Sequence, residues 1–295
     1  MNARMLLNPA AGRGRGRRSL AAIAAAARRH AIALEVPESP AALAECARRA
    51  AAEGVERLLV GGGDGTWHQA ARALAGSDCA LAPIALGTGN DLARELGFAL
   101  DPAVAIAQAV AAPLARIDLG RAGGGIFCGV AGSGFDSECA EYSKRVRRLR
   151  GPLVYTWSVI RVLAGFVPLR ATLDHDGGRF AGEVMFISLA NTRWFGGGMQ
   201  IAPQAEAADG LLDVVIVRRV SRVRLLAVFP RVYSGSHLSH PAISTLRTRR
   251  VRLGFDRASM LYGDGEAIVA VPREEEGGLE VRLDPRALAV VRPRI

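Results

Sequence analysis

The chain has 295 residues, half of them hydrophobic, and a formal net charge of +10 that arginine carries almost alone, since Lys144 is the only lysine. This composition excludes a disordered chain and allows one large domain or two smaller ones. The charge favours acidic partners such as nucleotides, nucleic acid or an anionic membrane surface.

The first third of the chain alternates short apolar runs with alanine-rich stretches. Strands are predicted at 4–8, 32–36, 56–60 and 82–86, and helices at 16–30, 40–53, 66–76, 90–97 and 101–112. Strands that alternate with helices of this length indicate a parallel α/β sheet.

The pattern of apolar and polar residues changes near residue 116. A helical region is predicted at 136–167, followed by strands at 180–190, 211–217, 248–254, 259–263, 267–271 and 279–283. This pattern indicates a mainly antiparallel β domain. We therefore expect an α/β domain at 1–118 and a β-rich domain at 119–295, whose last ~10 residues are free to return to the first domain.

The cysteines and the hydropathy set further limits. Cys46, Cys79, Cys128 and Cys139 show no CxxC spacing, which argues against structural zinc and for reduced thiols. No run of about 18 apolar residues is present, so no membrane span is expected. The apolar run near the N-terminus is too short for a signal peptide.

The stretch "LLVGGGDGTWHQA" (58–70) places Asp64 among four glycines, directly after a predicted strand. In an open parallel sheet, ligands bind beyond the carboxyl ends of strands, where backbone amides and the positive helix end suit phosphate. Thr66 is expected to cap the following helix. A carboxylate beside a phosphate needs a bridging divalent cation, so Asp64 indicates Mg²⁺ with a nucleotide. The alternative is a structural turn.

Two further loops follow apolar runs in the same way. "NPAAGRGRG" (8–16) follows the first strand, and "LGTGNDLAR" (86–94) follows the fourth, with Thr88 and Asn90 as polar groups. None of the loops has the GxxxxGK[ST] pattern or a strict GxGxxG pattern. One such loop is weak support for phosphate binding, whereas three in one α/β domain are much stronger.

With these motifs, the chain resembles the diacylglycerol kinase catalytic-domain family, which includes bacterial lipid kinases and sphingosine and ceramide kinases. "GGDGT" alone is shared with NAD kinases and 6-phosphofructokinases. "GSGFD" (132–136), the run 191–217 and "YGDGEAI" (262–268) resemble the lipid branch, so the resemblance covers nearly the whole chain. It implies an NAD kinase-like or diacylglycerol kinase-like α/β domain followed by a mainly antiparallel β domain.

The resemblance also implies roles for individual residues. ATP would be held by Asn8, Pro9, Ala10, Ala11, Gly12, Gly62, Gly63, Asp64, Gly65, Thr66, Thr88 and Asn90. Asp64 would join the Mg²⁺–phosphate network, with Asp136 as a second carboxylate. Asp264 and Glu266 would be the catalytic acid pair, one of them the general base on the lipid hydroxyl; spacing alone also allows a hairpin turn there. Glu206, Asp209 and the Leu211 carbonyl would bind a metal away from the chemistry.

The sequence departs from the family at two places. The family usually has Asn-Glu where this chain has His68 and Gln69, which removes a charge near the nucleotide. A threonine that often contacts nucleotide after the second strand is replaced by Pro37 or displaced to Ser39. These departures put details of nucleotide and metal binding in doubt, not the class of enzyme.

The stretch "KRVRRLRGPLVYTWSVIRVLAGF" (144–166) begins basic and turns apolar. As a helix it could lie on an anionic membrane or border a lipid-binding cleft; the alternative is a core-packed helix with a solvated basic end. The basic residues expected to dock are Lys144, Arg145, Arg147, Arg148 and Arg150.

Taken together, the sequence predicts an ATP- and Mg²⁺-dependent lipid kinase that transfers the γ-phosphoryl group to a lipid hydroxyl, with diacylglycerol as the first-choice acceptor and phosphatidic acid as product. It would be a cytoplasmic protein, peripheral at the inner face of an anionic membrane, without a nucleic-acid partner and with homodimerisation left open. Two alternatives are an NAD kinase-like phosphotransferase, whose further motifs are missing, and a non-catalytic basic module for membrane or nucleic acid, which would not explain three phosphate loops.

Overall fold

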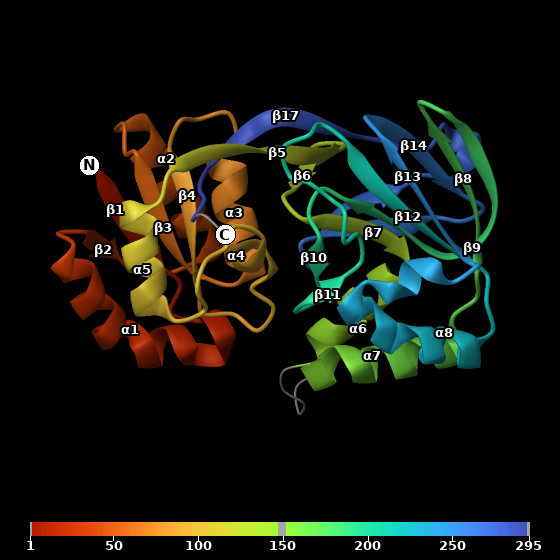
Figure 1. Cartoon of the computed structure of the whole chain (residues 1–295), viewed down its shortest axis with the longest axis horizontal. Coiled ribbons are helices and arrows are strands. Elements are labelled where there is room, and N and C mark those ends of the chain that lie inside the picture. The colour runs from red at the N-terminus through yellow and green to blue at the C-terminus, as the bar shows by residue number, and fades with distance from the viewer. Residues whose placement is uncertain (1, 147–151, 294–295) are drawn as a thin grey trace. The chain divides into compact units, whose positions relative to one another are not determined.

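The computed structural model describes residues 2–146 and 152–293 of the chain. These residues form two compact units (Figure 1). The first unit contains the residues up to Asp118 and those from Pro285 onward; the second contains Leu119–Asp284. The chain passes from one unit to the other in strands β5 (Leu114–Ala122) and β17 (Leu279–Val291). The end of the chain therefore returns to the first unit.

The first unit is built on the predicted parallel sheet. Its strands are β1 (Ala3–Leu7), β2 (Ala33–Glu35), β3 (Arg57–Gly62) and β4 (Ala80–Ala85), in the order β4-β3-β1-β2, with the end of β17 parallel to β4. The β4 strand and the run Leu58–Gly62 of β3 are buried, as expected for parallel strands covered on both faces. The predicted α/β class of this unit is confirmed.

Five helices cover this sheet: α1 (Ala11–Arg29), α2 (Pro40–Ala52), α3 (Asp64–Leu74), α4 (Asp91–Glu95) and α5 (Pro102–Ala111). Helices α1 and α5 pack together, as do α2 and α3 (Figure 1). Two helices begin earlier than predicted, α1 at Ala11 and α3 at Asp64. Left-handed residues at 12–14 interrupt the first turns of α1, so its regular part begins after them, near the predicted start. Thr66 is not an N-cap as predicted, because α3 begins at Asp64 with Gly63 as its cap.

The second unit is mainly antiparallel, as predicted. Its strands after β5 are β6 (Gly125–Phe127), β7 (Val130–Gly134), β8 (Leu169–His175), β9 (Gly178–Ala190), β10 (Trp194–Phe195), β11 (Met199–Gln200), β12 (Leu212–Arg218), β13 (Ile243–Thr248), β14 (Arg250–Phe255), β15 (Ser259–Gly263) and β16 (Glu266–Val271). The long strand β9 pairs with β8 along its first half and lies between β7 and β12 along its second half. Its inward side chains form much of the core.

Most helices of the second unit gather at one end of its sheets (Figure 1). They are α6 (Phe135–Arg145), α7 (Pro152–Gly165), α8 (Arg222–Val228) and the short 3₁₀ helices η1 (Phe229–Ser234) and η2 (Ser236–Ser239), whereas η3 (Glu274–Glu276) packs against β14. The helical region predicted at 136–167 thus contains two helices. Within the described residues, no helix is long and apolar enough to span a bilayer.

Candidate functional site

The first of the three predicted phosphate loops begins where β1 ends, and Asn8 ties it to the second loop. The Asn8 backbone N–H donates to the Gly61 carbonyl at 2.9 Å. Its side-chain Nδ2 donates to the Thr66 hydroxyl at 2.9 Å, while its Oδ1 accepts from the Ala10 N–H at 2.9 Å. The Thr66 hydroxyl therefore anchors the first loop instead of capping a helix.

Glycine lets the three loops pack against one another. A Cβ atom on Gly63 would lie 2.9 Å from the Gly87 Cα, and one on Gly87 would lie 2.6 Å from the Gly63 Cα. Gly12 has a φ of +58°, and a Cβ there would lie 2.0 Å from the Leu86 carbonyl oxygen. The sequence suggests that these glycines let a ligand approach the backbone. At Gly12, Gly63 and Gly87 the group that approaches is instead the backbone of a neighbouring loop of the same unit.

Asp64 holds the second and third loops together. Its two carboxylate oxygens accept the backbone N–H groups of Asn90 and Asp91, each at 2.8 Å. Asn90 takes the left-handed conformation, with φ +59°, and its side chain bonds both backbone groups of Gly87. Asp64 therefore satisfies two amides at the start of α4. Its predicted role with Mg²⁺ stays a prediction.

The residues predicted to hold ATP in these three loops all lie in the first unit, beyond the carboxyl ends of β1, β3 and β4. The Thr88 side chain is exposed at the tip of the third loop, where it is free to meet a ligand. The N-terminus of α3 follows directly from the second loop. This edge of a parallel sheet offers backbone amides and a helix N-terminus, which is the arrangement that binds phosphate.

The family departures have structural tasks here. His68 is buried, next to Trp67, whose indole N–H donates to the Val60 carbonyl at 2.8 Å. Ser39 caps α2, because its hydroxyl accepts the Ala42 N–H at 3.1 Å. His68 is thus part of the packed interior of the first unit, and Ser39 is an exposed helix cap.

In the second unit, Asp264 occupies a two-residue hairpin between β15 and β16. Asp264 and Gly265 have φ values of +53° and +80°, as a type I′ turn requires. The Asp264 carboxylate accepts the N–H groups of Cys128 at 2.7 Å and Gly129 at 2.8 Å. The sequence allows either a hairpin turn or a functional carboxylate at this position. The structure shows a hairpin turn whose aspartate is held by two backbone hydrogen bonds.

Asn191 braces the same loop, a contact that sequence reasoning missed. Its Nδ2 donates to the Cys128 carbonyl at 2.8 Å, and its backbone N–H donates to the Gly129 carbonyl at 2.8 Å. Burial and the nearby Asp264 charge raise the pKa of the Cys128 thiol well above its usual range. Cys128 therefore stays protonated and acts through its backbone, not as a nucleophile.

Glu266 lies in a different environment from Asp264. Its carboxylate pairs with the Lys144 Nζ at 2.8 Å, and both side chains are partly exposed. The Lys144 ammonium also lies 5.4 Å from the centre of the Tyr262 ring. Arg145 pairs with Glu141 at 2.6 Å. Two members of the predicted docking run thus have acidic partners, and its other three arginines, Arg147, Arg148 and Arg150, lie outside the described residues.

Asp136 stands at the start of α6, against the backbone of Gly132. Burial raises the pKa of its carboxyl group from 3.8 to about 7, although hydrogen bonds from the Ser137 N–H at 2.8 Å and the Ser188 hydroxyl at 3.5 Å oppose the shift. Neither of these two hydrogen-bond donors is a carboxylate that could share a metal ion with Asp136. Its role as a second Mg²⁺ ligand stays a prediction.

Replacing Asp136 with Asn is expected to stabilise the protein at pH 8. Because the folded-state pKa is raised, the folded protein holds this proton more tightly than the unfolded chain, and stability falls as pH rises from about 4 to about 7. Removing the charge should recover roughly 1–3 kcal/mol at pH 8 and little at pH 4. Thermal melts of both proteins at the two pH values measure this, and an equal difference at both would contradict it.

The loop at 206–211 holds its predicted aspartate beside an arginine. The Asp209 carboxylate accepts the Leu211 N–H at 2.9 Å and also pairs with Arg247. Asp213 lies 3.4 Å from the same guanidinium, and burial raises the pKa of its carboxyl group. Among the residues that the structure describes, no group of three His, Cys, Asp or Glu side chains is arranged to hold a metal. The metal predicted at Glu206, Asp209 and Leu211 would therefore compete with Arg247.

If this loop binds a cation, Mg²⁺ should raise the melting temperature of the wild-type protein more than that of Asp209→Ala. The variant should also melt lower without Mg²⁺, because it loses the Arg247 pair and the Leu211 hydrogen bond. Differential scanning fluorimetry with and without Mg²⁺ measures both effects. Equal Mg²⁺-induced shifts in the melting temperatures of the two proteins would contradict a metal site in this loop and would leave Arg247 as the cationic partner of Asp209.

Comparisons with known proteins agree with both units. Residues 2–122 match the model of the diacylglycerol kinase catalytic domain, and residues 129–292 match the YegS C-terminal NAD kinase beta sandwich-like domain. The chain is 35% identical over 252 residues to a diacylglycerol kinase of Mycobacterium tuberculosis, covering 83% of this chain and 79% of that protein. It is 37% identical over 173 residues to a probable YegS-like lipid kinase of Pseudomonas fluorescens, covering 58% of each.

A solved structure, that of a putative diacylglycerol kinase from Bacillus anthracis, shares the fold. The two superimpose with a TM-score of 0.80 at 20% identity, over 99% of this chain and 96% of that one. The match to both family models and the identity to the mycobacterial enzyme lead to one conclusion. The chain belongs to the diacylglycerol kinase family and is a lipid kinase.

Proposed function

We propose that the protein transfers the γ-phosphoryl group of ATP to the free hydroxyl of diacylglycerol and so produces phosphatidic acid. The observation that carries the nucleotide half is the set of three interlocked loops at the carboxyl edge of the parallel sheet, joined by Asn8–Thr66 and by Asp64 with the start of α4. The relatives named as diacylglycerol kinases support the acceptor.

The residues at this edge fit a nucleotide with its cation. The loops supply backbone amides to the phosphates, and the N-terminus of α3 adds its positive end. Each Asp64 oxygen accepts one amide, and a carboxylate has about four acceptor directions, so directions remain for a cation or its water. Mg²⁺, when bound, neutralises charge on the phosphates.

The transfer itself needs positioning and one proton acceptor. The lipid hydroxyl oxygen bonds to the γ-phosphorus while the bond from that phosphorus to the β-phosphate oxygen of ADP breaks, and the hydroxyl proton passes to a carboxylate. We assign Asp264 as this base, because two main-chain hydrogen bonds fix its carboxylate. Glu266, held in an exposed pair with Lys144, is assigned to positioning.

The acceptor lies in a bilayer, which places the working enzyme at a membrane surface. We propose a cytoplasmic protein that binds the inner face of an anionic membrane peripherally, with the basic run from Lys144 to Arg150 as one contact. This function requires no nucleic-acid partner, and it leaves homodimerisation open.

A comparison of acceptors tests the proposal. The purified protein is incubated with Mg²⁺ and γ-labelled ATP, together with diacylglycerol in mixed micelles or with NAD. We expect label in phosphatidic acid. Label in NADP, with none in the lipid, would replace the proposal with the NAD kinase alternative, and label in neither would overturn both acceptors.

A further inference from the structure

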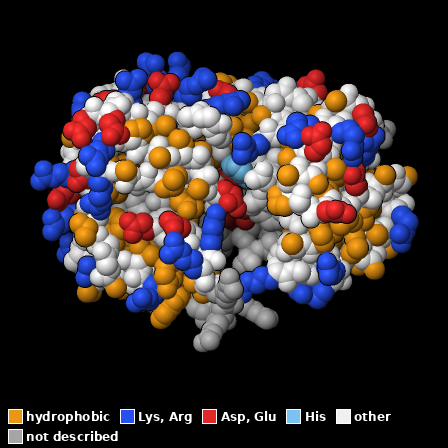
Figure 2. Space-filling view, turned by 180° about the vertical axis from the view of Figure 1, so that it is seen from behind, with side chains coloured by type: hydrophobic (Ala, Val, Ile, Leu, Met, Phe, Trp, Pro, Cys, Tyr) orange, Lys and Arg blue, Asp and Glu red, His pale blue; other side chains and the backbone are white. Residues whose placement is uncertain are grey.

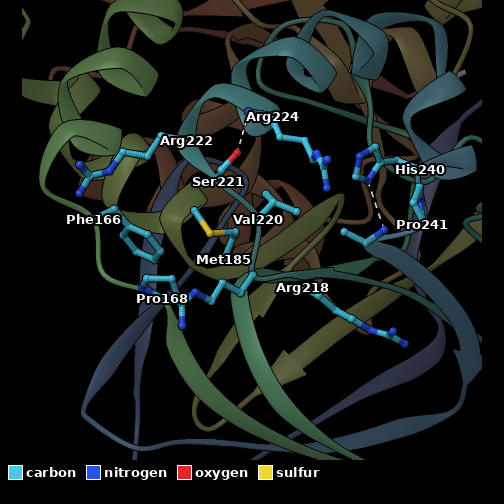
Figure 3. A pocket seen from close by; sticks show the side chains of 12 residues that line it. Phe166, Pro168, Met185, Arg218, Val220, Ser221, Arg222, Arg224, His240 and Pro241 are labelled. Atoms are coloured by element: carbon cyan, nitrogen blue, oxygen red, sulfur yellow. Dashed lines mark hydrogen bonds between the residues drawn. The ribbon is translucent and has the colours of Figure 1, made fainter.

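The second unit contains a pocket that the reaction above does not use. It has a volume of about 730 Å³ and lies where the ends of α7 and β12 meet the start of α8 (Figure 3). Phe166, Pro168, Met185 and Val220 give it an apolar wall. A pocket of this size and lining suits a small amphiphilic ligand.

Arginine supplies the polar part of this pocket. Arg218, Arg222 and Arg224 line it, and in Figure 3 Arg224 points between Val220 and His240 while Arg222 lies on the side of Phe166. No acidic side chain belongs to the lining, and these three arginines form no ion pair with any described residue. Arg219 is different, since it pairs with Glu183 at 2.9 Å. The pocket therefore concentrates positive charge that an anion would complement.

Apolar side chains stand exposed beside the arginines. Val223 of α8 is 79% exposed and Val167, after α7, is 60% exposed; Leu226, Trp157 and Ile160 on these two helices are exposed as well. On the face drawn in Figure 2, basic side chains lie among acidic ones. Apolar side chains next to unpaired arginines fit the interface of an anionic bilayer better than they fit nucleic acid or a free ion.

The pocket is remote from the proposed base within the same unit. Met185 in its wall lies five residues along β9 from Ala190, which pairs with Val130, the residue whose carbonyl accepts the Asp264 N–H. Five residues of strand span about 17 Å. A phosphate group bound in this pocket therefore lies far from the hydroxyl that would react at Asp264.

We infer that this pocket binds the phosphate-bearing headgroup of an anionic phospholipid, with the lining residues Arg218, Arg222 and Arg224 as its source of positive charge and the exposed residues of α7 and α8 in the bilayer interface. The choice of a membrane as the source of the phosphate rests on membership of the lipid-kinase family. The binding itself is independent of the proposed reaction, because it involves neither ATP nor Asp264.

The test is sedimentation of the full-length protein with vesicles of phosphatidylcholine alone or mixed with phosphatidylglycerol. Arg222→Gln/Arg224→Gln should weaken binding to the mixed vesicles on the order of 10- to 30-fold. The matched control, Arg28→Gln/Arg29→Gln, removes the same charge from exposed positions at the end of α1 and should change binding less than about threefold. Equal losses in the two variants, or none in either, would overturn the pocket assignment.

Two further arms separate the parts of the inference. Val223→Ser should weaken vesicle binding about 3- to 10-fold by removing an inserted apolar group, and an unchanged affinity would overturn insertion through α8. Calorimetry with inorganic phosphate should detect no binding that depends on Arg222 and Arg224. Such binding without a bilayer would identify a free anion, not a lipid, as the ligand. Because vesicle binding needs no turnover, its outcome stands even if diacylglycerol proves not to be the acceptor.

Discussion

Replacing Asp264 with Asn is expected to lower kcat for lipid phosphorylation by roughly 10²–10⁴-fold, the range for loss of a general base. The KM for ATP should change little, because the nucleotide loops belong to the first unit, which does not include Asp264. Glu266→Gln should cost much less, since Glu266 is assigned to an exposed pair with Lys144. Steady-state kinetics of the two variants measure the contrast.

Asp264→Asn also changes a structural contact, which the experiment must separate from the chemistry. The side-chain NH₂ group of the new asparagine would face the backbone N–H of either Cys128 or Gly129. The loss of a hydrogen-bond acceptor there costs about 1–3 kcal/mol of stability. Activity is therefore compared well below the melting temperature of the variant. Near-normal kcat in folded Asp264→Asn, or a larger loss in Glu266→Gln, would remove Asp264 as the base.

Asp64→Ala is expected to abolish productive use of Mg–ATP and to lower the free energy of unfolding. The substitution leaves the N–H groups of Asn90 and Asp91 without their acceptor, at a cost of about 2–4 kcal/mol in total. Without that tie the third loop is held to the second only through backbone contacts such as the Gly87 N–H with the Gly62 carbonyl, so ATP binding should weaken even without Mg²⁺. Calorimetric titration with ATP, with and without Mg²⁺, measures this.

The Mg²⁺ dependence separates two roles for Asp64. If the carboxylate only ties the loops, Asp64→Ala should weaken ATP and Mg–ATP binding by the same factor. If it also attracts the cation, Mg–ATP binding should suffer more. We expect the second result, and wild-type-like Mg–ATP affinity in the variant would contradict both roles.

The meeting of the three loops at one edge of the sheet could be predicted from the sequence because its signals are local. Each loop follows an apolar strand directly, and strands of a parallel sheet end at a common edge, so Asn8, Asp64 and Asn90 could be placed near one another without coordinates. What glycine does there could not be predicted. Sequence shows only that the backbone comes close to something, and the structure shows neighbouring loops at Gly63 and Gly87.

The support around Asp264 could not be predicted, because it depends on contacts between distant parts of the chain. Asp264 meets the N–H of Cys128 across 136 residues of sequence, and Asn191 reaches the same loop across 63. No local pattern at Cys128 signals such a contact. The strand β7, with the sequence VAGSG, was missed for a related reason: glycine and serine have low strand propensity, and only its burial between β15 and β9 makes it a strand.

Arg247 is a third case of this kind. The sequence around Glu206 and Asp209 resembles a metal loop, whereas the cation that the folded chain places beside Asp209 and Asp213 comes from β13, more than thirty residues later. The local sequence shows the acidic residues of this loop, whereas only the folded chain shows that Arg247 pairs with Asp209.

The most direct test of the account is product analysis after one incubation. Wild-type protein and Asp264→Asn are each supplied with Mg–ATP and a total lipid extract enriched in diacylglycerol, and new phosphomonoester lipids are identified by mass spectrometry. The account predicts phosphatidic acid as the main new lipid with the wild-type protein and almost none with the variant. A different phosphorylated lipid would contradict the acceptor, and the absence of any new phospholipid with folded wild-type protein would contradict the proposed reaction.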